Sequence, residues 1–443
     1  MFLLLARSGA GSNPILGGTR YDLKLRNPWP NCALVPRHAA AVLSVLHLTR
    51  RDSELLRRLT EQEWRGALDY ADRERLTLVL REAAQDVMPA WARERVDRNE
   101  EANRVRMQGI AATYGQITEW LSAEHLDFLF LKGMTHAPLF GLPATNRVQY
   151  DIDLWLPAEH ALRAQRLLMA RGYESMPGTE GLRTDHLPPL VRKTGWQWRG
   201  DFFDPEIPLP VELHVQFWNR EQERIEAPGV EAFPQRRDTC ALEGLPIPAL
   251  HPVDAAGYAA LHVLRHVLTG SVRLFHVYEV AAMLHARAGD AAFWTEWKQL
   301  HCADLRRLEA LSFRLASEWF GCSVSPAVEE EMAGQRGRTG AWFGQFGLSP
   351  AVLAFHPNKD HLWLHLTLLE SRRDAWSVAL QRILPWRLPA AAGDAFIREE
   401  DLSWRDRLRW RCHWAAHAGR RAWYHVRAVP SVLVSGFRWW RAR

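Results

Sequence analysis

The sequence predicts an α+β protein in which a small mixed β-sheet is flanked by helical N-terminal and C-terminal regions. Three observations predict this class: a helical spacing of apolar residues before about residue 125, short apolar or alternating segments between 126 and 217, and a return to helical spacing after 254. With 443 residues the chain can hold two or three domains. We expect four regions: an irregular lead-in and helical N-terminal region, a sheet-containing core, a helical region and a basic helical C-terminal region, over 1–125, 126–225, 226–345 and 346–443.

The composition is that of an ordinary soluble protein, with 47% hydrophobic and 24% charged residues. A net charge of +5 permits contact with phosphates or an anionic surface without requiring it. The five cysteines are scattered with no C-x-x-C pair, which argues against a disulfide framework or a zinc site. No apolar stretch is long enough for a signal peptide or a membrane span, so we expect a cytoplasmic protein.

The N-terminal region begins with residues 1–36, which are rich in Gly, Pro and Asn and predict an irregular lead-in. Helical spacing follows from Arg37 to about His125, with Asp72–Val87 as one separate helix. Asn99–Ser122 is expected to form one long amphipathic helix. Its predicted apolar side carries Val105, Ile110, Tyr114, Ile117 and Leu121.

The pattern then changes to that of a sheet. Leu126–Leu131 is a short apolar run that predicts a buried strand. Met134–Leu142 is a candidate helix, and Pro157 is placed to open another that ends near Gly172. Residues 174–208 are expected to be irregular, and 226–253 are linker-like.

Two segments alternate strictly between polar and apolar residues, Tyr150–Leu156 and Pro210–Phe217. Asp151 and Asp153 share one face of the first predicted strand, and the rise of a strand places their Cα atoms about 6.6 Å apart. Glu212 lies on the polar face of the second. Three carboxylates so placed can hold a pair of hard cations about 3.5–4 Å apart. Oxygen ligands favour Mg²⁺ or Mn²⁺ over zinc.

Three short motifs carry a resemblance to a known family. Phe130-Leu-Lys-Gly133, Arg147-x-x-x-Asp151-Ile-Asp-Leu154 and Val211-Glu-Leu-His214 resemble the bacterial uncharacterised nucleotidyltransferase family of the polymerase-beta-like superfamily. The resemblance extends from the helices before Phe128 to about Phe320. It implies a mixed sheet flanked by helices, a divalent-metal site, and transfer of a nucleotidyl group from an NTP to an acceptor hydroxyl that the sequence leaves unidentified.

The resemblance also assigns roles to the carboxylates. Asp151 and Asp153 would hold the metal ions, and Glu212 would hold one of them and help to deprotonate the acceptor. His214 has two interpretations, a metal ligand or a histidine that supports the site, and the second is favoured because Mg²⁺ prefers oxygen.

A second group of residues is assigned to the nucleotide. Lys132 and Gly133 stand where the wider superfamily has a glycine-serine pair at a helix start, so backbone N–H groups and the lysine charge would meet the outer phosphates. Arg147 would contact a phosphate or pair with the acidic strand. Glu279 stands where the family often has Asp, which leaves its role open. Lys132 could instead be a solvated charge, and four histidines are interpreted as structural or local hydrogen-bonding residues: His136, His186, His262 and His266.

The C-terminal tail is the most basic part of the chain. From about Ala351 the spacing is helical, with predicted breaks near Leu384–Pro385 and at Pro430. Residues 401–443 hold ten arginines against two aspartates, so the tail carries +8, and they hold six of the 21 tryptophans. Three interpretations stay open: tryptophans packed on the body with arginines in water, peripheral contact with an anionic membrane, and, less favoured, a nucleic-acid groove.

The leading functional hypothesis is therefore a metal-dependent nucleotidyltransferase with Mg²⁺ or Mn²⁺ as cofactor and an NTP and an unknown acceptor as substrates. A second hypothesis is a catalytically inactive binding module that keeps the fold, in a cell-surface polysaccharide or peptide-modification pathway. A third is a transferase that modifies nucleic-acid ends and grips them with the basic tail. The presence of all three carboxylates favours the enzyme, and Lys-Gly in place of Gly-Ser supports the second hypothesis.

Overall fold

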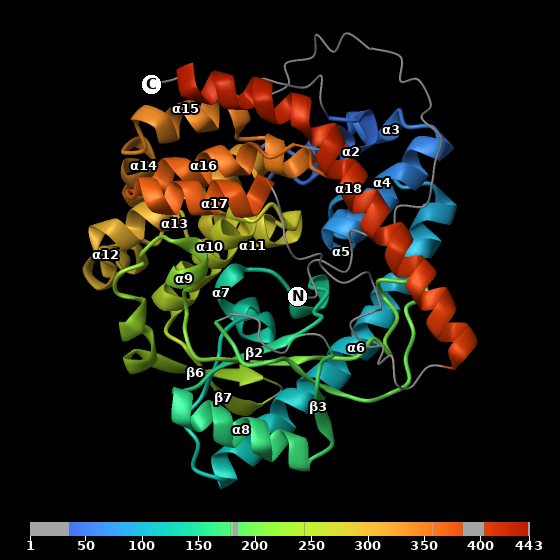
Figure 1. Ribbon diagram of the computed structural model, residues 1–443, viewed down its shortest axis with the longest axis vertical. Helices are drawn as coiled ribbons and strands as arrows, with labels where there is room; N and C mark the ends of the chain where they lie inside the picture. Colours follow the sequence, from blue (N-terminus) through green and yellow to red (C-terminus); the bar gives the residue numbers. More distant parts are fainter. Residues whose placement is uncertain are drawn as a thin grey trace.

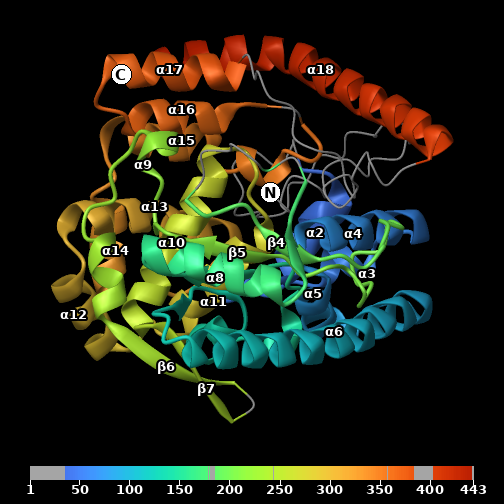
Figure 2. The ribbon, with the colours of Figure 1, turned by 60° about the horizontal axis from the view of Figure 1, so that its bottom comes forward.

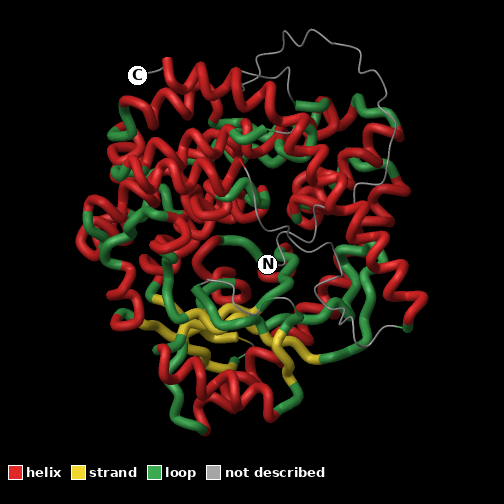
Figure 3. Tube along the Cα trace, in the orientation of Figure 1, coloured by secondary structure: helices red, strands yellow, loops and turns green. Residues whose placement is uncertain are grey.

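The fold is α+β, as predicted, with helical regions on both sides of one mixed sheet (Figures 1 and 3). The computed structural model describes residues 35–177, 179, 185–242, 244–356, 358–383 and 403–441. The predicted lead-in before residue 35 and the predicted break near Leu384–Pro385 lie outside these residues. None of the described helices is long and apolar enough to cross a membrane.

The N-terminal region is helical from residue 37 onward. Its helices are α2 (Arg37–Val45), α3 (Glu54–Arg57), α4 (Glu61–Glu74), α5 (Thr77–Ala84) and α6 (Ala90–Ala123). Helix α6 confirms the predicted long helix and extends it by about two turns at its start. Ile110, Tyr114, Ile117 and Leu121 are buried as expected. The prediction for Val105 is wrong, because that side chain is 46% exposed.

Seven strands form a single mixed sheet in the order β3-β4-β5-β2-β1-β7-β6. The strands are β1 (Leu129–Phe130), β2 (Ile152–Trp155), β3 (Tyr173–Ser175), β4 (Leu190–Arg192), β5 (Val211–His214), β6 (Arg237–Leu242) and β7 (Leu245–Leu250). Strand β2 pairs in parallel with β5 and antiparallel with β1. The two segments that alternate in the sequence are thus neighbours near the centre of the sheet.

The linker-like interpretation of residues 226–253 is wrong, because this segment contains β6 and β7. Strand β7 includes Pro246 and Pro248, and proline normally argues against an inner strand because it cannot donate to the ladder. Here β7 pairs with β1 at one position only, Phe130 with Ala249, so neither proline has to donate a hydrogen bond to β1. Residues 174–208 were likewise expected to be irregular, yet they contribute β4.

Helices make up the rest of the described chain. Short helical segments lie between β1 and β2, namely η2 (Gly133–His136), α7 (Ala137–Phe140) and η3 (Ala144–Asn146). The later helices are α8 (Ala158–Ala170), α9 (Arg220–Glu223), η4 (Val230–Gln235), α10 (Pro252–Leu268), α11 (Leu274–Ala286), α12 (Ala291–Leu300), α13 (Ala303–Phe320), α14 (Pro326–Ala333), α15 (Gly337–Phe346), η5 (Ser349–Val352), α16 (Asp360–Leu368), α17 (Arg372–Ile383) and α18 (Trp404–Arg441). The predicted break at Pro430 is wrong, since α18 continues through this exposed residue.

The two faces of the sheet have different partners (Figure 1). Helices α6 and α8 cover one face, where Ile152, Leu154 and Leu213 join Ile110 and Leu168 in one apolar cluster. The other face is turned toward α10 and α11, which belong to a larger helical core. Because strand side chains alternate between faces, Asp153 and Glu212 lie on the side of α10, away from the apolar cluster.

A buried charge network connects helices α10, α12 and α13. His301 Nε2 lies 3.0 Å from Asp254 Oδ1 on α10, and its Nδ1 lies 2.7 Å from Glu309 Oε1 on α13. Arg236 pairs with Asp254, and the Trp297 indole donates to Glu309. Burial lowers the pKa of His301, but Glu309 and Asp254 together raise it to about 9.

His301→Gln should lower the free energy of unfolding by about 3–5 kcal/mol, because it leaves the buried Glu309 carboxylate without its charged partner. The raised pKa also fixes the pH dependence. The stabilisation from His301 is complete below its ordinary pKa of 6.5 and is lost as pH rises through about 9. Urea unfolding at about pH 6 and about pH 10 measures both effects. The exposed His356→Gln is the control, and equal losses in the two variants would contradict the role of the network.

Candidate metal and nucleotide site

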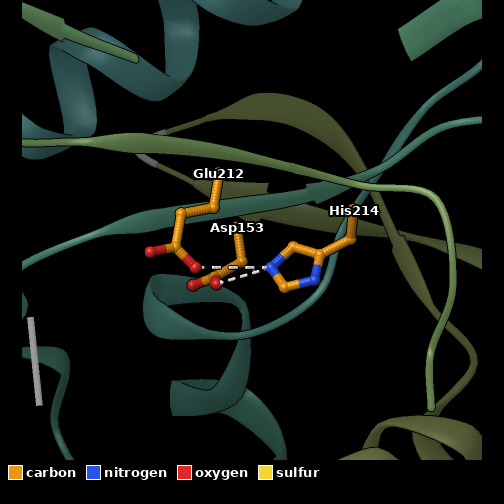
Figure 4. Close-up of side chains that lie close together, drawn as sticks. All are labelled: Asp153, Glu212 and His214. Atoms are coloured by element: carbon orange, nitrogen blue, oxygen red, sulfur yellow. Dashed lines mark hydrogen bonds and ion pairs between the residues drawn. The ribbon is translucent and has the colours of Figure 1, made fainter. Parts of the chain in front are cut away.

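The centre of the candidate site is a pair of carboxylates on neighbouring parallel strands. Asp153 on β2 lies directly opposite Glu212 on β5, and both side chains are buried. With His214 they form a group whose ligating atoms all lie within 4.8 Å of one another (Figure 4). The expectation that Glu212 lies on a neighbouring strand within reach of the Asp-x-Asp carboxylates is confirmed for Asp153.

His214 joins these carboxylates to a second ion pair. Its Nε2 lies 3.0 Å from Asp153 Oδ1 and 3.6 Å from Glu212 Oε2, and dashed lines mark both contacts in Figure 4. Its Nδ1 lies 3.2 Å from Asp185 Oδ2, which in turn lies 2.5 Å from Arg265 Nη1 on α10. Both ring nitrogens thus face carboxylates, which favours the interpretation of His214 as a residue that positions Asp153 and Glu212.

Lys132 lies between the two aspartates of the Asp-x-Asp motif. Its Nζ lies 3.2 Å from Asp153 Oδ2 and 3.9 Å from Asp151 Oδ2. The interpretation of Lys132 as a solvated charge is wrong, since the residue is 7% exposed. Asp151 precedes β2 by one residue and is half-buried, so the predicted strand Tyr150–Leu156 is shorter than expected.

Burial and the neighbouring charges set the protonation of these groups. Burial raises the pKa of Asp153, but the Lys132 ammonium and the hydrogen bond from His214 hold it below its ordinary value. Burial also raises the pKa of Glu212, yet His186 and His214 bring it well below the ordinary value. For Asp151 burial prevails over Lys132, and its pKa is raised. The pair on the strands is therefore ionised at neutral pH.

Gly133 is required by the turn that presents Lys132. Its φ is +79°, and a Cβ atom there would lie 2.6 Å from Gln149 Nε2 and 2.6 Å from the Tyr114 hydroxyl oxygen. Any side chain would therefore meet both strain and a steric clash.

The helix expected over Met134–Leu142 is in fact the four-residue turn η2 followed by the four-residue α7.

Arg147 forms a buried ion pair with Glu279 on α11. A structural ion pair was one of its two interpretations, but the partner was expected on the acidic strand. The Glu279 carboxylate also lies 3.4 Å from His136 Nδ1. Burial raises the pKa of Glu279, but Arg147 and His136 bring it to about 2. The residue at the position where the family often has Asp thus serves as a fixed counter-ion of Arg147.

A small polar cavity borders Lys132 on the side of α10. Lys132 Nζ lies 3.3 Å from His262 Nε2, which lies 3.0 Å from His266 Nε2. The cavity also borders Arg147 and Glu279, and it offers about 10 Å³ for the centre of a water molecule. That is room for a single water. His262 thus helps to hold Lys132 in place, and the interpretation of His262 and His266 as structural stays a prediction.

Sequence reasoning missed Asp185 and Arg265, which complete the network around His214. Asp185 comes from a segment rich in Pro and Gly that carries no periodic signal, and it reaches His214 through the pairing of His186 with His214. Arg265 is one of many arginines on helices. The usable signal was chemical, because a buried His214 needs a hydrogen-bond partner for its second ring nitrogen.

The fold and the paired carboxylates define a nucleotidyltransferase-type protein, and comparison with known families gives the assignment. Residues 60–321, more than half of the chain, match the model of the family described as "Uncharacterised nucleotidyltransferase". The chain belongs to this family.

Two further comparisons add little. No curated protein matches the chain. Among solved structures, the chain resembles that of an antigenic nucleotidyltransferase-like protein from Paracoccidioides brasiliensis, with 14% identity, a TM-score of 0.28, and coverage of 48% of this chain and 93% of the other. This similarity is too low to compare the two folds in detail.

Proposed function

We propose that this protein is a metal-dependent nucleotidyltransferase that moves a nucleotidyl group from an NTP to an acceptor hydroxyl. The observation that carries the proposal is the register of β2 and β5, which brings the carboxylates of Asp153 and Glu212 together on one buried face. Membership of the nucleotidyltransferase family supports the same chemistry. The acceptor and the preferred base are left open.

The residues present fit a divalent cation. Asp153 and Glu212 supply buried carboxylate oxygens. Asp151 supplies a third carboxylate, which lies on the other side of the Lys132 ammonium. Oxygen donors of this kind suit Mg²⁺ or Mn²⁺. When bound, such an ion neutralises the charge that develops on the transferred phosphoryl group.

The residues of the chain itself divide the remaining tasks. Glu212, ionised at neutral pH, accepts a hydrogen bond from the acceptor hydroxyl and orients it. His214, held by Asp185, keeps Asp153 in place. Lys132 neutralises the aspartates, and with a cation bound there its ammonium would be available to the outer phosphates.

The inactive binding module is the competing hypothesis, and the family assignment does not favour it. In such a module Lys132 would remain the permanent counter-ion of Asp151 and Asp153, and no divalent cation would bind between them. The two hypotheses therefore differ in the affinity of these carboxylates for Mn²⁺ as well as in NTP turnover.

Asp153→Asn should weaken Mn²⁺ binding at least about 100-fold, because it removes a charged ligand from the centre of the site. Isothermal titration calorimetry of the full chain measures the affinity. The matched control is Asp238→Asn, which makes the same change at an exposed position of β6. Equal Mn²⁺ affinity in Asp153→Asn and the unchanged protein would remove the metal site from these strands.

A further inference from the structure

Helix α18 is attached to the body by a narrow side of mostly small or polar residues. The buried residues of its 38 are His417, Ala428 and Ser435. The Trp363 indole of α16 donates to Ser435 Oγ at 2.8 Å, and Trp439 stacks on Trp363 with 5.3 Å between ring centroids. At about 100° per residue, the three buried positions fall on one side of the helix. The helix therefore docks without using most of its large apolar residues.

Those apolar residues face away from the body. The large hydrophobic side chains that α18 exposes are Trp404, Leu408, Trp414, Trp423, Val426, Val429, Leu433, Val434, Phe437 and Trp440. Leu408, Val426 and Leu433 fall within about 20° of one another and about 140–160° from Ala428 on a helical wheel. Leu433 is 69% exposed. In the part of the chain that the structure describes, the second half of α18, from Trp423 to Trp440, thus presents an apolar stripe to the outside, which soluble proteins rarely do without a partner.

Arginines border this stripe. Helix α18 contains nine arginines and a single acidic residue, Asp406. Arg409, Arg427 and Arg438 lie about 100° from the centre of the stripe, along one flank. An apolar face with cationic flanks and tryptophans is the pattern of a helix that lies in the interface of a bilayer. Arginine side chains can extend from such a helix to the lipid phosphates.

Neighbouring helix α17 enlarges the same surface. It packs on α16, as α18 does, and both run along one edge of the molecule, opposite β6 and β7 (Figure 2). Trp376 of α17 is 78% exposed, and Leu380 and Ile383 are also exposed. At about 1.5 Å per residue α18 is about 57 Å long. The combined surface is large enough to lie flat on a membrane.

We propose that α18, together with the exposed side of α17, binds the surface of an anionic membrane and holds the transferase there as a peripheral protein. Charge complementarity selects this partner. A second copy of the chain would bring nine arginines against nine arginines. A nucleic acid would need cationic and stacking side chains at the centre of the face, where Leu408, Val426 and Leu433 lie instead.

The test is co-sedimentation of the full chain with vesicles of phosphatidylcholine alone and with about 30% phosphatidylserine. We expect binding to the anionic vesicles only, and weaker binding as salt screens the arginines. Leu433→Glu combined with Phe437→Glu should weaken this binding at least about tenfold, because both side chains lie in the stripe. The control places the same two charges on α8, at the exposed Leu162 and Met169, and should bind as the unchanged protein does.

Several outcomes would overturn the proposal. These are no binding to anionic vesicles, equal binding to neutral ones, or full binding by the Leu433 and Phe437 variant. A concentration-dependent dimer that this variant abolishes would assign the stripe to a second copy. Salt-sensitive oligonucleotide binding that the variant abolishes, without vesicle binding, would assign it to nucleic acid. Because both substituted residues are exposed, an unchanged thermal unfolding profile verifies that the variant is folded.

Discussion

Lys132→Met should destabilise the metal-free protein by about 3–5 kcal/mol, and Mn²⁺ should restore much of the loss. The ammonium lies 3.2 Å from Asp153 and 3.9 Å from Asp151, and methionine keeps the length of the side chain without its charge. Without Lys132 the buried carboxylates lose the ammonium that lies between them, which is the costly way to break a buried pair. A divalent cation can then take the place of the ammonium.

Urea unfolding with and without Mn²⁺ measures this exchange. At a concentration of about 100 times its Kd, a ligand of the folded state adds about 2.7 kcal/mol of stability. The unchanged protein should gain less from Mn²⁺, because Lys132 competes for the same carboxylates. Lys298→Met is the matched control: this lysine pairs with Glu330 at an exposed position, where an ion pair contributes about 0–1 kcal/mol. A destabilised Lys132 variant that Mn²⁺ does not rescue would contradict the exchange.

Asp153→Asn and Glu212→Gln should each lower NTP-dependent transfer about 1,000-fold, the scale of losing one preorganised electrostatic group. Both changes are nearly isosteric, so the fold of β2 and β5 is kept. The loss should appear in the rate of pyrophosphate release at saturating NTP and Mg²⁺. Asp238→Asn should release pyrophosphate at the rate of the unchanged protein, and a comparable rate in Asp153→Asn would exclude this carboxylate from the reaction.

The sequence was sufficient for the parts of the site that local patterns determine. Alternation of polar and apolar residues predicted that Asp153 and Glu212 share a face, because Ile152 and Leu213 bury the opposite face against α6 and α8. The long helix α6 was predictable for the same reason, since its apolar residues repeat at the helical spacing. The periodicity of apolar residues therefore predicts a helix or strand wherever one face of that element is buried.

Other features depend on partners distant in the chain. Pro246 and Pro248 normally argue against an inner strand, and the fold alone reveals that β7 pairs with β1 at a single position. The ion pair of Arg265 with Asp185 joins residues 80 positions apart, and neither has a distinguishing neighbourhood in the sequence. The burial of Lys132 between two aspartates likewise follows from the turn at Gly133, whose close packing no periodicity reveals.

The most direct test of the proposed transferase is the fate of two labels on the NTP. The full chain, with Mn²⁺, receives each of the four nucleotides labelled at either the α- or the γ-phosphate, with a size-fractionated cell extract as the source of acceptor. Nucleotidyl transfer predicts that the α-label of at least one nucleotide enters a product and the γ-label leaves as pyrophosphate, and that Asp153→Asn abolishes both events. Transfer of the γ-label, α-label transfer that survives Asp153→Asn, or no transfer from any nucleotide would contradict it.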